Sequence, residues 1–143
     1  LLALNQHKEA AGWAEQALRI SRYDYRVLHI LAEANNMLEN DSDTIKYAQE
    51  YLAVNPEGRL QAQMYSYLGE AFYRIGEFNH ADIALTTAVQ LAPNRAEWWL
   101  LLGQAREAAE NLVLAEEAYR RALALRPNLT EATAAVQRLS DNS

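Results

Sequence analysis

The 143-residue sequence contains no cysteine, which excludes disulfides, thiolate metal sites and cysteine nucleophiles. Glycine and proline are scarce, with five and three residues, so the composition is neither collagen-like nor that of a low-complexity disordered chain. The glycines are isolated from one another, and no glycine-rich phosphate-binding loop is present. With half of its residues hydrophobic, the sequence predicts one ordered domain that binds no nucleotide.

Positive charge is also in deficit, because 13 Lys and Arg stand against 19 Asp and Glu, for a formal net charge of -6. This charge opposes a phosphate backbone, so we expect no nucleic-acid partner. No apolar run reaches the length of a membrane span, and we expect a soluble protein without membrane insertion, in the cytoplasm or the periplasm. The chain opens with Leu1–Leu4 and has no initiating Met, from which we expect a piece of a longer protein.

Residues that could carry catalysis or bind a metal are scattered. The histidines, His7, His29 and His80, do not have the spacing of a metal motif. The segment 41–43 begins like a calcium loop but lacks the later Gly and Glu, so we interpret it as a polar turn whose Asp41 or Ser42 caps the next helix. We therefore predict no catalytic residues, no metal, no cofactor and no enzymatic activity.

A period of 34 residues runs through the second half of the chain. The matching pairs are Gly69 and Gly103, Ala81 and Ala115, Ala88 and Ala122, and Pro93 and Pro127. A fixed period of this length predicts an array of stacked units in which contacts are mostly between neighbours.

Within a unit, the apolar residues fall on one face of a helix. Tyr65, Leu68, Gly69 and Phe72 lie at i, i+3, i+4 and i+7. The glycine marks the place where a partner helix approaches most closely. A proline follows each second helix, where a residue that cannot donate a backbone hydrogen bond ends the helix. The sequence therefore predicts pairs of packed helices.

The spacing inside the units resembles the tetratricopeptide repeat pattern W-x2-L-G-x2-Y…A-x3-F…P. The last complete unit contains Trp99, Leu102, Gly103, Ala115, Tyr119, Ala122 and Pro127, with Arg106 where the family has an aromatic residue. The unit before it contains Tyr65, Leu68, Gly69, Phe72, Ala81, Leu85, Ala88 and Pro93. The resemblance implies an all-α fold, a right-handed superhelical solenoid of antiparallel helix pairs.

We expect a single repeat domain over residues 1–143. Its parts are a partial repeat (1–24), three repeats (25–61, 62–95 and 96–129), and a closing helix with a tail (130–143). In the partial repeat we expect a first helix cut to Leu1–Leu4, followed by a second helix with Ala10, Ala14, Ala17 and Leu18.

The spacing from Pro56 to Pro93 exceeds the period by three residues, and the surplus lies in 57–61. We interpret it as a helix that starts almost one turn early. The alternative is a local change of superhelix pitch.

Most aromatic residues are expected to serve helix packing. Trp99 occupies the core aromatic position of the family pattern, whereas Trp98 either packs on the preceding helix or stands partly exposed. Trp13, Tyr47 and Tyr51 lie on second helices and are expected to pack between adjacent helices.

The resemblance also implies a concave surface, lined by the first helices, where peptides or helices of partner proteins bind. The residues one, five and eight positions beyond each core aromatic or leucine are expected to face it. They are His29, Glu33, Asn36, Ser66, Glu70, Tyr73, Leu100, Gln104 and Glu107. A family subgroup clamps the carboxylate tail of chaperones with Lys, Asn and Arg, but none of these nine is Lys or Arg, so we expect no binding of that tail.

Three glutamates, Glu33, Glu70 and Glu107, recur on this surface. They predict a partner segment with basic and apolar residues, whose apolar part would contact Tyr73 and Leu100. A simpler interpretation is that these side chains only keep the surface soluble.

The sequence thus predicts a protein–protein interaction scaffold or adaptor that holds a peptide or helix of a partner in the concave groove. The alternative is a docking, regulatory or oligomerisation domain of a larger enzyme whose catalytic part lies outside this chain. Self-association into a homo-oligomer is left open.

Overall fold

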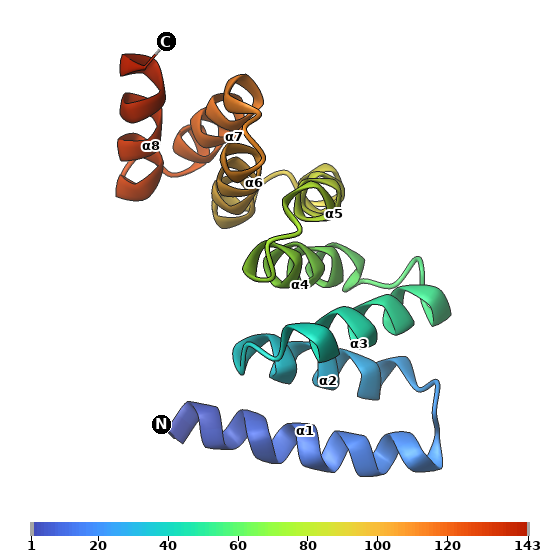
Figure 1. Ribbon diagram of the computed structural model, residues 1–143. Coiled ribbons are helices and arrows are strands. Elements are labelled where there is room, and N and C mark those ends of the chain that lie inside the picture. Colours follow the sequence, from blue (N-terminus) through green and yellow to red (C-terminus); the bar gives the residue numbers. More distant parts are fainter. Residues whose placement is uncertain (1, 143) are drawn as a thin grey trace.

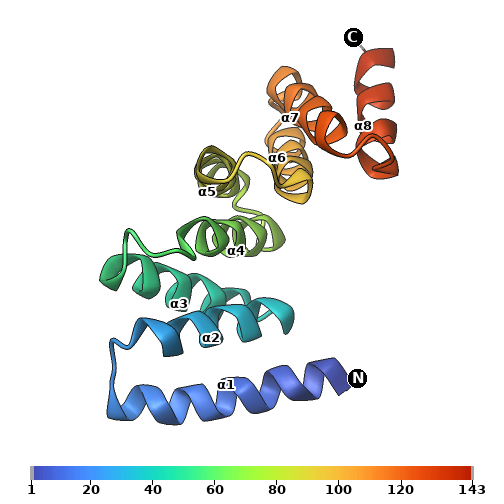
Figure 2. The same cartoon turned by 180° about the vertical axis from the view of Figure 1, so that it is seen from behind.

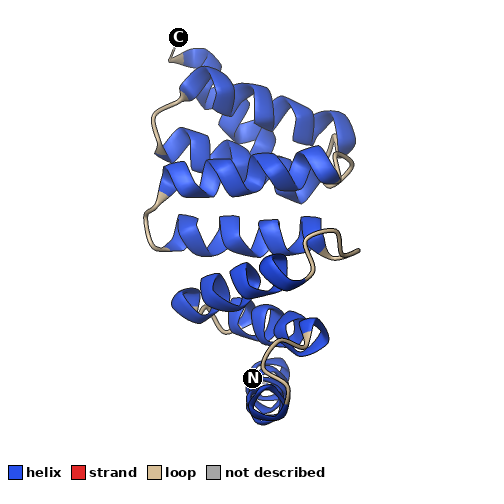
Figure 3. Ribbon diagram, turned by 90° about the vertical axis from the view of Figure 1, so that its right-hand side faces the viewer, coloured by secondary structure: helices blue, strands red, loops and turns tan. Residues whose placement is uncertain are grey.

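The computed structural model describes residues 2–142, which form helices joined by short loops, with no strand in that range (Figures 1 and 3). Leu1, expected in the cut first helix, and Ser143, expected in the tail, lie outside the described residues. The helices are α1 (Leu2–Ile20), α2 (Tyr25–Met37), α3 (Asp41–Val54), α4 (Gln61–Arg74), α5 (Phe78–Leu91), α6 (Ala96–Ala108), α7 (Leu112–Leu125) and α8 (Thr130–Asp141). The predicted all-α solenoid of helix pairs is confirmed.

The helices stack in chain order and the stack curves (Figures 1 and 2). Helix α2 also contacts α4, and α4 contacts α6, whereas α3, α5 and α7 make no comparable contacts with one another in the described part of the chain. The first helices of the pairs are therefore closer together and line the inner side of the curve. Of the helices described, none is long and apolar enough to cross a membrane.

Glycine permits the close contact inside each of the last two pairs. A Cβ atom added at Gly103 would lie 2.7 Å from the ring of Tyr119, and one added at Gly69 would overlap the side chain of Leu85. The repeated spacing of a small residue on one helix and a large one on the other lets the backbones approach without leaving a void.

The first complete pair, α2 and α3, buries the polar residues Asn35 and Thr44, and at the position of Thr44 the later pairs have the buried Ala81 and Ala115. Asn35 is 3% exposed, its amide donates to the carbonyl of Leu31 at 2.8 Å, and its Oδ1 accepts from Asn40 at 3.1 Å. The buried hydroxyl of Thr44 donates to the carbonyl of Asn40 at 3.0 Å. Because these groups are hydrogen-bonded, the degenerate repeat carries little desolvation penalty.

Two expectations about the chain path are wrong. Helix α1 runs without a break from Leu2 to Ile20, so no separate first helix ends at Leu4. The three residues by which the spacing from Pro56 to Pro93 exceeds the period lengthen the loop before α4 and do not extend the helix. Successive turns there place the Gly58 amide on the Asn55 carbonyl at 3.1 Å and the Gln61 amide on the Gly58 carbonyl at 3.0 Å.

The tryptophans divide between packing and exposure. Trp98 is 6% exposed and packs on α5, while the half-buried Trp99 donates its Nε1 hydrogen to the carbonyl of Pro93 at 2.8 Å. Tyr47 and Tyr51 are buried as expected, but Trp13 is 73% exposed. Trp13 lies away from the α1 face that packs on the next helix, so its predicted packing role is wrong.

A candidate binding groove on the inner face

The nine predicted groove residues lie on α2, α4 and α6, the helices of the inner side. Seven are partly exposed, but Asn36 and Ser66 are 3% and 0% exposed. The Ser66 hydroxyl donates to the Gln63 carbonyl of its own helix at 2.7 Å. Asn36 and Ser66 are buried and hydrogen-bonded to other groups of the chain, so their side chains do not face a partner as expected.

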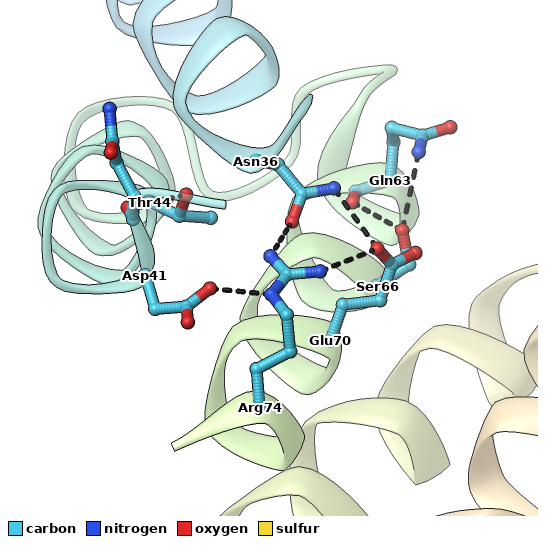
Figure 4. Close-up of polar contacts among 8 residues, drawn as sticks. Asn36, Asp41, Thr44, Gln63, Ser66, Glu70 and Arg74 are labelled. Atoms are coloured by element: carbon cyan, nitrogen blue, oxygen red, sulfur yellow. Dashed lines mark hydrogen bonds and ion pairs between the residues drawn. The ribbon is translucent and has the colours of Figure 1, made fainter. Parts of the chain in front are cut away.

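Asn36 belongs to a polar network that joins three helices (Figure 4). The guanidinium of Arg74 donates to Oδ1 of Asn36 and to Oδ1 of Asp41, each at 2.6 Å, and lies 3.5 Å from Oε2 of Glu70. The amide of Asn36 donates to the same Glu70 oxygen at 3.1 Å. Asp41 therefore binds an arginine of the next repeat instead of capping α3, whose N-cap is Asn40.

A second glutamate of the inner face, Glu107, is held by the closing helix. Arg138 of α8 donates to both carboxylate oxygens at 2.6 and 2.7 Å, and the hydroxyl of Tyr119 donates to Oε1 at 2.8 Å. Burial alone would raise the pKa of Glu107, but these two donors and the charge of Arg138 lower it overall. Burial, followed by the hydrogen bond to Glu107, raises the pKa of Tyr119.

The third glutamate, Glu33, is more open. Its side chain is 47% exposed, and its neighbours are the Tyr67 hydroxyl, which donates at 3.5 Å, and Nε2 of His29 at 4.0 Å. Burial, followed by the charge of Glu33, raises the pKa of Tyr67, which stays a neutral donor. Glu33 is thus the one glutamate of the three without an arginine partner in the described residues.

A hollow of about 210 Å³ lies on the inner face between α4 and α6. It is lined by Tyr73, Gln104, Glu107, Ala108 and Tyr119, so three of the predicted residues meet there. Leu100 is not among them, because it packs against the cluster formed by α7 and α8. Tyr73 thus lines the hollow and Leu100 does not, and the expectation that both contact the apolar part of a partner stays a prediction.

The pH dependence of stability is expected to show that Arg138 and Tyr119 stabilise the ionised form of Glu107. Since the folded-state pKa of Glu107 lies below its usual value of 4.5, the stability from its ionised form is present above that value and is lost as the pH falls through the folded pKa. The variant Glu107→Gln keeps an acceptor for Tyr119 but cannot titrate. Urea unfolding should show the wild type losing more stability than the variant between pH 7 and about pH 3. If the stability of the wild type and of the variant fell in parallel as the pH is lowered, this stabilisation of Glu107 would be contradicted.

Comparison with known proteins identifies the architecture. The family model described as "Tetratricopeptide repeat" matches residues 96–129, the segment that contains α6 and α7. The pairs α2–α3 and α4–α5 repeat the same arrangement before it. Residues 96–129 therefore match a tetratricopeptide repeat, and the helix pairs before them share its architecture.

Solved structures share the tetratricopeptide fold over most of the chain. MamA 41-end from Desulfovibrio magneticus RS-1 is 20% identical, with a TM-score of 0.87 over 99% of this chain and 78% of that one. The Arabidopsis OM64 tetratricopeptide domain is 23% identical, with a TM-score of 0.74 over 83% and 96%. The first such domain of Spaghetti (RPAP3), bound to the HSP90 peptide SRMEEVD, is 23% identical, with a TM-score of 0.74 over 82% and 91%. At these identities the likeness concerns the fold. A comparison with curated protein sequences found no significant match.

Proposed function

We propose that this tetratricopeptide repeat protein is a scaffold that binds an extended or helical segment of a partner on its inner face. Tetratricopeptide repeat proteins serve as protein-interaction scaffolds, and one structural neighbour holds a peptide. The observation that supports the proposal most directly is the hollow lined by Tyr73, Gln104 and Tyr119, which joins two repeats and is large enough for one side chain. The proposal includes no catalytic residue, metal or cofactor.

The charges of the inner face indicate where a basic residue of the partner would bind. Glu70 and Glu107 are neutralised by Arg74 and Arg138, whereas Glu33 is open. A basic residue of the partner would therefore be attracted to Glu33 on α2, while its apolar side chain fills the hollow between α4 and α6. Exposed charge pairs contribute only about 0–1 kcal/mol each, so affinity should come mainly from the apolar contact and partner choice from the charge.

Reversing the open charge tests this proposal. We expect Glu33→Lys to weaken the binding of a natural partner by up to about fivefold at low salt, and less at high salt, where screening has removed most of the attraction. Isothermal titration against the purified partner at two salt concentrations measures the effect. Glu131→Lys, an exposed charge reversal on α8, is the control and should change little. Equal effects of both variants would mean that the partner responds only to net charge.

An acidic chaperone tail should not bind. The peptide SRMEEVD seen on the Spaghetti (RPAP3) domain carries mostly negative charge, whereas Arg74 and Arg138 of this chain are already occupied by its own carboxylates. Fluorescence anisotropy with labelled SRMEEVD should give a Kd weaker than about 1 mM. Micromolar binding would show that these arginines are released to the ligand and would contradict the charge argument.

A further inference from the structure

The first turn of α7 exposes three consecutive apolar residues. Leu112, Val113 and Leu114 are 50%, 83% and 45% exposed. One period earlier, the residues at the positions of Val113 and Leu114 are Asn79 and His80. Leu112 is matched by the apolar Phe78, but the repeat fold does not require apolar residues at the other two positions, so the exposed Val113 and Leu114 need another explanation.

The surface around this triplet is hollowed. Leu112 and Val113 line a hollow of about 280 Å³ together with Leu139 of α8. Val113 also borders a larger hollow of about 390 Å³ that runs along α7 past Glu117 and Arg120. The apolar triplet thus leads into a shaped strip along the exposed side of one helix.

This strip has the spacing of a helix-pairing surface. Val113, Glu117, Arg120 and Ala124 are all exposed and follow one another at intervals of four, three and four residues, so they form one ridge. Helix α7 packs on α6 and α8 through its other side, through Ala115, Ala118, Tyr119 and Ala122 (Figure 1). The ridge, which we call the α7 ridge, therefore stays free within the chain.

The charge pattern of the α7 ridge is complementary to itself. Two acidic residues, Glu116 and Glu117, are followed one turn later by two basic residues, Arg120 and Arg121. When two such helices pack antiparallel about a twofold axis between residues 118 and 119, Glu117 faces Arg120 of the second copy, and Val113 faces Ala124 of the second copy. Each contact occurs twice because the interface is isologous.

We propose that the α7 ridge is a homodimer interface in which a second copy of this chain packs its own α7 antiparallel. The chain carries a net charge of -6, which disfavours self-association elsewhere on its surface, but the two charges of the ridge cancel, as do those of the neighbouring Glu116 and Arg121. Arg120 already binds Glu116 at 2.6 Å, and its side chain is 59% exposed, so its remaining donors are available to Glu117 of the second copy. The inner face stays open in this dimer, so the inference is independent of the proposed function.

Charge reversal across the twofold axis tests this arrangement. Sedimentation velocity on the purified chain should show a monomer–dimer equilibrium, and Glu117→Arg or Arg120→Glu alone should weaken the dimer at least about tenfold by placing like charges opposite each other. An equimolar mixture of the two variants should dimerise again, because each mixed pair restores opposite charges at both contacts. Circular dichroism before mixing verifies that both variants are folded.

The apolar part of the α7 ridge has a matched control. Val113→Ser should weaken the dimer at least about tenfold, since a buried valine is lost at two symmetric places. Ile83→Ser removes an aliphatic side chain that is 67% exposed on α5 and should leave the dimer unchanged. A wild-type chain that stays monomeric at millimolar concentration would overturn the proposal. So would a dimer that resists both charge reversals, or a mixture that fails to recover.

Discussion

Replacing Gly103 by leucine is expected to lower the free energy of unfolding by about 1–3 kcal/mol or more. Already the first added atom, Cβ, would lie 2.7 Å from the ring of Tyr119, so either that ring or helix α6 must move. Moving Tyr119 also breaks its hydrogen bond to Glu107 and so disturbs the hollow between α4 and α6. Urea unfolding followed by circular dichroism measures the loss.

Gly12 offers a matched control on α1, because a Cβ added there meets nothing within 4 Å. Gly12→Ala should stabilise the protein by roughly 0.5–1 kcal/mol, since alanine loses less backbone entropy in a helix than glycine does. If Gly103→Leu left the stability unchanged while Gly12→Ala raised it, the close contact between α6 and α7 would be refuted.

The second large effect is expected from Arg74→Ala, which should cost about 2–3 kcal/mol. Removing the guanidinium leaves Asp41 and Glu70 without their cation and leaves the nearly buried Asn36 without a donor to its Oδ1. The loss should appear first where α2, α3 and α4 meet, as faster hydrogen exchange at the end of α2 and the start of α3.

Arg120 supplies the comparison for Arg74, because its ion pair with Glu116 is an i, i+4 pair on one exposed helix face. Measured in monomeric protein, Arg120→Ala should change the free energy of unfolding by about 0.5 kcal/mol or less. Equal losses for the two variants would mean that the Arg74 network contributes no more than an ordinary surface pair.

The fold could be predicted from the sequence because its determinants recur at fixed positions. Gly69 and Gly103 mark close helix contacts, and Pro93 and Pro127 mark helix ends. The 34-residue period therefore contains both the residues that pack the helices and the residues that end them. The period has no information about a loop outside it. For that reason it does not distinguish a helix that starts early from the longer loop that the turns at Pro56 and Gly58 form before α4.

The candidate site was only partly predictable. Helical periodicity placed Tyr73, Gln104 and Glu107 on one face, and they do meet around one hollow. It did not reveal Arg138, which reaches Glu107 from a helix 31 residues further along the chain. Nor did it reveal Arg74, although its position directly after Tyr73 at the end of α4 was a usable signal. Long side chains choose partners from neighbouring repeats by three-dimensional distance, and local spacing does not encode that choice.

The binding of a partner on the inner face is tested most directly by site-specific photo-crosslinking. A photoreactive phenylalanine analogue is placed at Gln104, which lines the hollow between α4 and α6, or at Ile83, which is 67% exposed on α5. The protein is then irradiated together with its partner. The account predicts an adduct from position 104 and none from position 83. An adduct from position 83 alone would place the partner on the outer side and contradict the account.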